Sequence, residues 1–267
     1  MNEFVRIWRQ AGSGELAWLD ADGVPSAATV VPLVERSDTG AAVPCVALTY
    51  DRAALATPPA NATAVAFAVT DSRWLPGGTG ALAAVGRVVV SADLSGEHFA
   101  DDLLDQELRK YPPARAIADT PLLRRENWWY LPRVIVRLDR VDRVQELPAR
   151  RDAGRDALIV RDDGTGLRLD VASAADWSAP TVDLGPGPLR GDGAPTLAHG
   201  HDHSPDRERW ETWSVHGTLL GDRLEVAGRD GGPGLDPSPL RLMERLRHAR
   251  ALERGCKRGI AAAERGA

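Results

Sequence analysis

Lysine is almost absent from this chain, which has two, Lys110 and Lys257, among its 33 basic residues. Arginine supplies the rest of the positive charge, yet Asp and Glu outnumber the basic residues and the net charge is −5. A nucleic-acid-binding protein usually shows a clustered excess of basic residues. We therefore interpret the abundance of arginine as a bias of composition and expect no nucleic-acid partner.

Cysteine and long apolar runs are also scarce. Cys45 and Cys256 lie far apart in the sequence, which gives no disulfide framework, and there is no apolar leader and no run of 18 apolar residues. We expect a cytoplasmic protein with reduced thiols and no contact with a membrane. Cys45 lies in the apolar run 43–48, where we expect a buried and unreactive thiol.

The motifs of several enzyme classes are missing. The sequence has no glycine-flanked serine elbow, no Cys–His pair at catalytic spacing, no phosphate-binding loop ending in Lys-Ser or Lys-Thr, and no dinucleotide fingerprint. These absences argue against a hydrolase or a kinase. The segment 107–110 contains one of the two lysines, and we interpret it as a solvated helix face.

A short phrase occurs twice in the chain. Residues 21–26 read Ala-Asp-Gly-Val-Pro-Ser, and residues 191–196 read Gly-Asp-Gly-Ala-Pro-Thr. In each copy Asp-Gly supplies the backbone freedom of a tight turn, Pro fixes φ at the entrance of a strand, and a small hydroxyl residue leads into extended chain. The repetition predicts two related β units, each opened by a turn.

Alternating and helical patterns predict the elements of the first unit. We expect strands at 16–19, 27–34, 43–50, 62–70, 81–92 and 133–138, and helical segments at 1–12, 51–55, 95–109 and 114–124. Gly86, inside the fifth of these strands, is expected to mark a bulge or a close approach of two backbones.

The second unit is shorter. We expect strands at 157–160, 167–171, 197–203, 211–219 and 223–227, then a basic helix at 239–263 that packs on the protein's own β units and frays over its last dozen residues. The predicted division of the chain is 1–148, 149–235 and 236–267.

The first hairpin carries a family resemblance. An apolar strand, the turn Asp-Ala-Asp-Gly, a Pro-Ser pair and a second apolar strand follow one another over 16–34. This order resembles the entry to the split β-barrel of the pyridoxamine 5′-phosphate oxidase-like, FMN-binding family. The resemblance implies a mainly β fold, a β-barrel with α insertions, in a homodimer whose groove holds FMN. It also implies an oxidoreductase that passes hydride or electrons to a small-molecule substrate.

The resemblance further implies a flavin site. Members of the family hold the phosphate with basic and hydroxyl side chains from the strand after Pro-Ser and from the turn after the third strand. Arg52 is the best local candidate, since a guanidinium matches two phosphate oxygens. The candidate cofactor-binding residues are Thr29, Thr49, Tyr50, Arg52, Arg87 and Trp129, the last offering a ring on which a cofactor could stack.

Two alternatives stay open beside a flavin enzyme. The enzymes that oxidise pyridoxamine phosphate carry an arginine where this chain has Ala28, which favours a non-catalytic protein that binds a flavin, a deazaflavin or haem, or no cofactor. The other is a metal or haem site. His199, His201 and His203 share one face of a strand and could meet one metal ion, although a polar, solvent-facing strand explains the same pattern.

Overall fold

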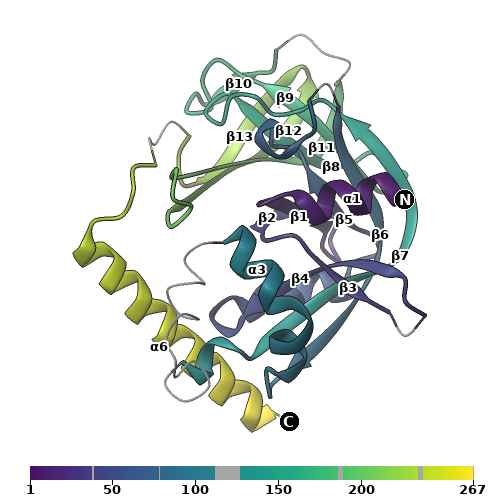
Figure 1. Cartoon of the computed structure of the whole chain (residues 1–267). Coiled ribbons are helices and arrows are strands. Elements are labelled where there is room, and N and C mark those ends of the chain that lie inside the picture. Colours follow the sequence, from purple (N-terminus) through teal and green to yellow (C-terminus); the bar gives the residue numbers. More distant parts are fainter. Residues whose placement is uncertain (38, 78, 112–126, 186–188, 234–236, 267) are drawn as a thin grey trace.

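The computed structural model describes residues 1–267 except 38, 78, 112–126, 186–188, 234–236 and 267. The described chain is mostly β, with two antiparallel sheets and a long C-terminal helix (Figure 1). This confirms the predicted fold class. The helix expected at 114–124 lies outside the described residues. No helix of the described chain is both long and apolar enough to cross a membrane.

The first sheet has the strand order β2-β1-β5-β6-β7-β4-β3. Its strands are β1 (Gly14–Leu19), β2 (Pro25–Val30), β3 (Leu33–Arg36), β4 (Ala42–Thr49), β5 (Val65–Val69), β6 (Ala81–Asp93) and β7 (Arg133–Leu147). Helical segments connect or cover them: α1 (Asn2–Gln10), η1 (Tyr50–Ala56), α2 (Thr57–Asn61), η2 (Ser72–Trp74), η3 (Phe99–Leu103), α3 (Leu104–Lys110) and η4 (Trp128–Tyr130).

The second sheet has the order β10-β13-β12-β11-β8-β9. Its strands are β8 (Asp156–Asp162), β9 (Leu167–Ser173), β10 (Thr181–Asp183), β11 (Gly191–His203), β12 (Trp210–Gly221) and β13 (Arg223–Asp230). The helix α6 (Leu242–Gly266) follows. The two sheets are built from separate stretches of sequence, and the division of the chain into domains at residue 148 stays a prediction.

The first sheet is a curled half-barrel because its two edge strands are neighbours in the sequence. β2 and β3 lie at opposite ends of the strand order, yet only Val31 and Pro32 separate them. A link this short reaches about 11 Å, so the sheet bends until its edges approach each other. The prediction of one strand over 27–34 was wrong, because Pro32 has no N–H to give to a ladder and the chain breaks there to change edges.

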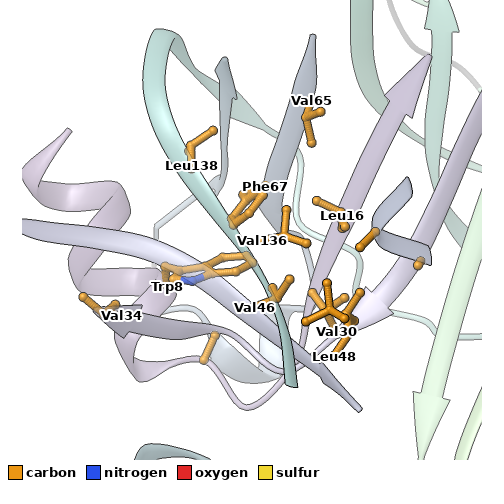
Figure 2. Close-up of a cluster of buried hydrophobic side chains, with 14 of the residues drawn as sticks. Trp8, Leu16, Val30, Val34, Val46, Leu48, Val65, Phe67, Val136 and Leu138 are labelled. Atoms are coloured by element: carbon orange, nitrogen blue, oxygen red, sulfur yellow. The ribbon is translucent and has the colours of Figure 1, made fainter. Parts of the chain in front are cut away.

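The concave side of this sheet encloses an aromatic and aliphatic core, part of which is shown in Figure 2. Trp8 of α1 lies at its centre, with its ring centroid 5.0 Å from that of Phe67 on β5. Its indole Nε1 donates a hydrogen bond of 2.8 Å to the backbone oxygen of Leu33. The predicted N-terminal helix therefore plugs the half-barrel and fixes the start of β3.

The opposite side of the first sheet packs against the second sheet. This side is rich in alanine, which lets another sheet approach closely. All six residues of β1 are buried, since both of its faces are covered. The residues that meet between the sheets include Ala17, Ala66, Ala68, Ala83, Leu158, Val160, Leu169 and Leu197.

Two expectations about glycine-containing segments had opposite outcomes. Gly86 is confirmed as a close approach: a Cβ built there would lie 1.8 Å from the backbone oxygen of Arg140, and the register of β6 with β7 shifts beside it. The turn expected at 191–196 was wrong. That copy lies within β11, where the pairing with β12 shifts between Asp192 and Pro195, so Pro occupies a bulge instead of a strand entrance.

The C-terminal half of α6 packs on η1. A Cβ on Gly259 would lie 2.3 Å from the backbone oxygen of Tyr50, and Cys256 and Ile260 on the same face are buried. The expected fraying of the last dozen residues was wrong, because this glycine lets the helix backbone rest directly on η1. The exposed end is the other one, where Leu242, with 72% of its surface exposed, begins the helix.

Candidate functional site

A cavity of about 540 Å³ opens where five parts of the fold meet. It lies between the end of α1, strand β3, η2, helix α3 and the connection from β11 to β12. Its lining residues are Arg9, Gln10, Gly12, Val34, Arg36, Trp74, Gln106, Arg109, Lys110 and Arg207. The volume falls within the range of about 300–1,000 Å³ typical of small-molecule sites. We refer to this space as the arginine cavity.

The lining of the arginine cavity is strongly cationic. Five of its side chains are basic and none is acidic. Within the described part of the chain, Arg9, Arg36 and Arg207 form no ion pair, and Arg109 reaches only Asp105, at 4.0 Å and in full contact with solvent. Charges of one sign that converge without partners create a potential that attracts anions.

Arg207 is held in position by its loop and by Trp74. Its guanidinium carbon lies 5.4 Å from the centroid of the Trp74 ring, and its Nη1 donates a 2.7 Å bond to the backbone oxygen of Lys110. Its φ is 58°, the single positive value at a non-glycine position among the described residues. Such backbone conformations cluster at ligand sites.

Trp74 adds an aromatic wall with an unused donor. Its indole Nε1 is buried and has no hydrogen-bond partner among the described residues. A buried N–H without a partner is costly and uncommon in proteins. An acceptor on a bound molecule would satisfy it.

Lys110 lines the cavity from the end of α3. It is 8% exposed, and its Nζ donates to the backbone oxygens of Pro32, at 2.5 Å, and Trp8, at 3.2 Å. Burial, together with the charge of Arg9, lowers the pKa of the amine to about 7. The interpretation of 107–110 as a solvated helix face was therefore wrong for Lys110, and Glu107 is buried as well.

A buried ionic cluster lies between the two sheets. Glu15 of β1, Arg150 and His201 of β11 are each at most 3% exposed. Arg150 Nη2 lies 3.3 Å from Glu15 Oε1 and 2.6 Å from His201 Nε2, and Thr70 donates to Glu15 as well. Burial raises the pKa of Glu15, but the hydrogen bond and charge of His201 and the charge of Arg150 outweigh it and leave the pKa below its usual value.

A second cavity of about 510 Å³ lies beside this cluster. Its charged lining residues are Asp71, Arg73, Arg150, Arg151, Asp152 and Asp202, together with His201. Because the two signs are equally represented, it lacks the preference for anions that the arginine cavity has.

The three histidines of β11 have different surroundings. His199 is buried, with Nε2 3.0 Å from Thr29 Oγ1 and Nδ1 3.1 Å from Ser214 Oγ. Burial lowers the pKa of His199 to about 3, and burial and Arg150 lower that of His201. The solvent-facing strand offered as an alternative was wrong for both, since each is at most 3% exposed.

His203 lies apart from this buried pair, with its ring 5.8 Å from that of Trp74. Among the described residues, no three His, Cys, Asp or Glu side chains are grouped to hold a metal ion.

The six predicted cofactor-binding residues are spread over the first unit. Arg52 Nη2 donates a 3.0 Å bond to the backbone oxygen of Thr29, so these two meet. Tyr50 is buried under α6 with no partner for its hydroxyl among the described residues. Thr49 ends β4, Arg87 is exposed on β6, and Trp129 is buried. None of the six lines the arginine cavity or the second cavity.

Sequence reasoning missed the arginine cavity itself. Its charges come from residues as far apart as Arg9 and Arg207, on elements whose contact only the fold creates. One signal was available for Lys110: it is a rare lysine in a chain that otherwise uses arginine.

Comparisons with known proteins give weak likenesses. No family model and no curated protein matches the sequence. The structure of HutZ, a heme storage protein from Vibrio cholerae, is 11% identical over 54% of this chain and 92% of that chain, with a TM-score of 0.34. A heme binding protein from Mycobacterium smegmatis is 16% identical over 96% of this chain and 98% of that chain, with a TM-score of 0.30.

Atu2129 from Agrobacterium tumefaciens, a protein of unknown function, is 19% identical over 54% of this chain, with a TM-score of 0.34. The match spans little more than half of that protein, 56% of its length. No family follows from these comparisons.

Proposed function

We propose that this protein binds an anionic aromatic small molecule in the arginine cavity, with flavin mononucleotide as the first candidate. One observation carries the proposal: five basic side chains and no acidic one surround a space of about 540 Å³. A bare cluster of this kind is costly for the empty protein, because like charges repel. An anion would relieve that repulsion.

A phosphate suits this lining. Guanidinium groups bind phosphate oxygens in pairs through parallel N–H bonds, and Arg9, Arg36 and Arg207 approach the cavity from different elements. Trp74 supplies an indole face for a ring. The cavity could therefore hold both the phosphate and the ring system of FMN. A deazaflavin phosphate has the same two groups.

Haem fits the same lining less well. Its propionates would suit the arginines, but haem iron is held by His, Cys, Met or Tyr. None of these types lines the arginine cavity. We therefore propose a phosphate-bearing ligand before a tetrapyrrole.

We place the ligand in the arginine cavity instead of at Thr29 and Arg52. The hydroxyl of Thr29 is bonded to His199, and its backbone oxygen accepts from Arg52. Both groups are already used within the protein. In the cavity, by contrast, the cationic side chains have unused capacity.

A bound flavin supplies hydride and electron transfer, which would make the protein an oxidoreductase with a small-molecule substrate. The chain's own residues would hold the phosphate and orient the ring. The homodimer and the cytoplasmic location expected from the sequence stay predictions.

The test is a titration of FMN and of riboflavin, followed by quenching of flavin fluorescence. Hydrogen bonds to charged groups contribute about 1.5–3 kcal/mol each, so the phosphate should tighten the Kd by about tenfold or more. The double variant Arg36→Gln/Arg207→Gln should weaken FMN binding by about 10- to 100-fold and leave riboflavin binding nearly unchanged.

Arg223→Gln is the matched control, since Arg223 is 66% exposed and does not line the cavity. Equal affinity for FMN and riboflavin, or a double variant that binds FMN as the parent does, would refute the site. A saturable Soret band with added haem, lost in the double variant, would move the assignment to a tetrapyrrole.

A further inference from the structure

Lys110 differs from an ordinary buried lysine in what surrounds its amine. A buried ammonium is normally paired with a carboxylate, because an isolated charge inside a protein is costly. Lys110 has no carboxylate partner among the described residues. Its Nζ donates to two backbone oxygens, of Pro32 and Trp8. Two acceptors suffice for the two N–H groups of a neutral amine and leave its lone pair unused.

Burial favours that neutral form. It lowers the pKa of Lys110 to about 7, a shift that Cys45 opposes and that the nearby cation Arg9 increases. About half of the molecules then carry the neutral amine at pH 7, against about one in 2,500 for an unperturbed lysine. Desolvation beside another cation is a known way to make a lysine nucleophilic.

Lys110 also lines a space that selects ligands. It lines the arginine cavity with Arg9, Arg36 and Arg207. An anionic group held by these side chains would bring the rest of a small molecule next to Lys110.

We propose that Lys110 is a covalent binding site: its amine forms an imine with a phosphorylated aldehyde or ketone held in the arginine cavity. This rests on the anion-binding role proposed above. It goes beyond that role by naming a nucleophile and a carbonyl-containing class of ligand.

The chemistry needs no further reagent. Nζ attacks the carbonyl carbon and forms a C–N bond, and the two amine protons leave with the carbonyl oxygen as one molecule of water. If the imine nitrogen takes up a proton, the N–H formed in this way donates to one of the two backbone oxygens. The anionic group of the ligand then offsets part of the new charge.

The two lysines of the chain make a direct test possible. Lys257 lies on α6, paired with Glu253 and 45% exposed, so it reports the reactivity of a solvated amine in the same molecule. The protein is incubated at pH 7 with glyceraldehyde 3-phosphate and sodium cyanoborohydride, which traps imines. Peptide mass spectrometry then gives the rate of labelling at each lysine.

We expect Lys110 to be labelled at least about tenfold faster than Lys257. Unphosphorylated glyceraldehyde should label Lys110 at least about tenfold more slowly, because it lacks the group that the arginines hold. Arg9→Gln should slow the labelling of Lys110 at pH 7, since loss of that cation favours the protonated amine. Lys257→Met should leave the rate at Lys110 unchanged.

Labelling of Lys110 no faster than that of Lys257 would overturn the proposal. Because this is measured on the parent protein, no variant has to fold for that result to count. Fast labelling with no preference for the phosphorylated aldehyde would overturn the assigned ligand class. The labelling rates are measured without flavin. Slow labelling of Lys110 and failure to bind FMN are therefore separate results.

Discussion

Replacing Arg150 by methionine should destabilise the protein by about 3–5 kcal/mol, the usual cost of leaving a buried charge without its partner. The side chain of Arg150 is 2% exposed. It donates to Thr70 Oγ1 at 2.8 Å and contacts Glu15 and His201 from the linker between the two sheets. Its loss leaves the carboxylate of Glu15, 1% exposed, without a permanent positive charge nearby.

The assay is equilibrium unfolding in urea at pH 7, and the chain supplies its own control. Arg151 is the next residue and is exposed, so Arg151→Met should change the free energy of unfolding by less than about 0.5 kcal/mol. The double variant Glu15→Gln/Arg150→Met removes both charges, and it should be more stable than the sum of the two single changes predicts. Equal costs for the two arginine variants, or strict additivity, would refute the reasoning.

Two further predictions concern pH and α6. Because the pKa of His199 is lowered to about 3 from an unfolded value near 6.5, the unfolded chain binds more protons between these values. Stability should fall as the pH drops through that window, by up to about 1.4 kcal/mol per unit for this residue. His199→Gln should flatten the pH dependence measured by urea unfolding between pH 7 and 5, and an unchanged slope would contradict this. Gly259→Ala should cost about 1–3 kcal/mol and speed proteolysis of α6, because its Cβ would meet the backbone oxygen of Tyr50. Gly266→Ala, with open space around it, should do neither.

Local chemistry made much of the fold predictable. The helix at the N-terminus follows from the spacing of Phe4 and Trp8, both of which are buried. The hairpin of β8 and β9 follows from Asp163-Gly164 between two apolar runs, and the pairing confirms it. Cys45 is buried as expected. In these cases the residues that carry the sequence pattern are the same residues that form the element, or lie within a few positions of it.

The misses have a shared physical cause, which is contact between distant segments. At Pro32 the chain passes from one edge of the first sheet to the other, and the second Asp-Gly-Ala-Pro copy is extended because β12 pairs along it. His199 and His201 alternate with other residues as a half-exposed strand would, but the first sheet covers that face. Alternation shows which residues share a face and leaves open whether another layer covers it.

The same limit applies to the candidate site. Arg9, Arg36 and Arg207 look ordinary in their own segments, and only their convergence makes a cationic cavity. The resemblance instead directed attention to Thr29 and Arg52, which the fold does bring together.

The alanine-rich side of the first sheet is synthesised before the residues that cover it. The strands of that sheet end at residue 147, whereas the residues that cover this side begin at β8 and include Leu197 of β11. Once β7 has left the ribosome, every strand of the half-barrel is present, but its outer surface stays incompletely covered until at least 50 more residues emerge. During that interval the nascent chain displays an apolar surface of the kind that chaperones recognise and that promotes aggregation. Truncations after residue 150 should consequently be insoluble even though every strand of the first sheet is present.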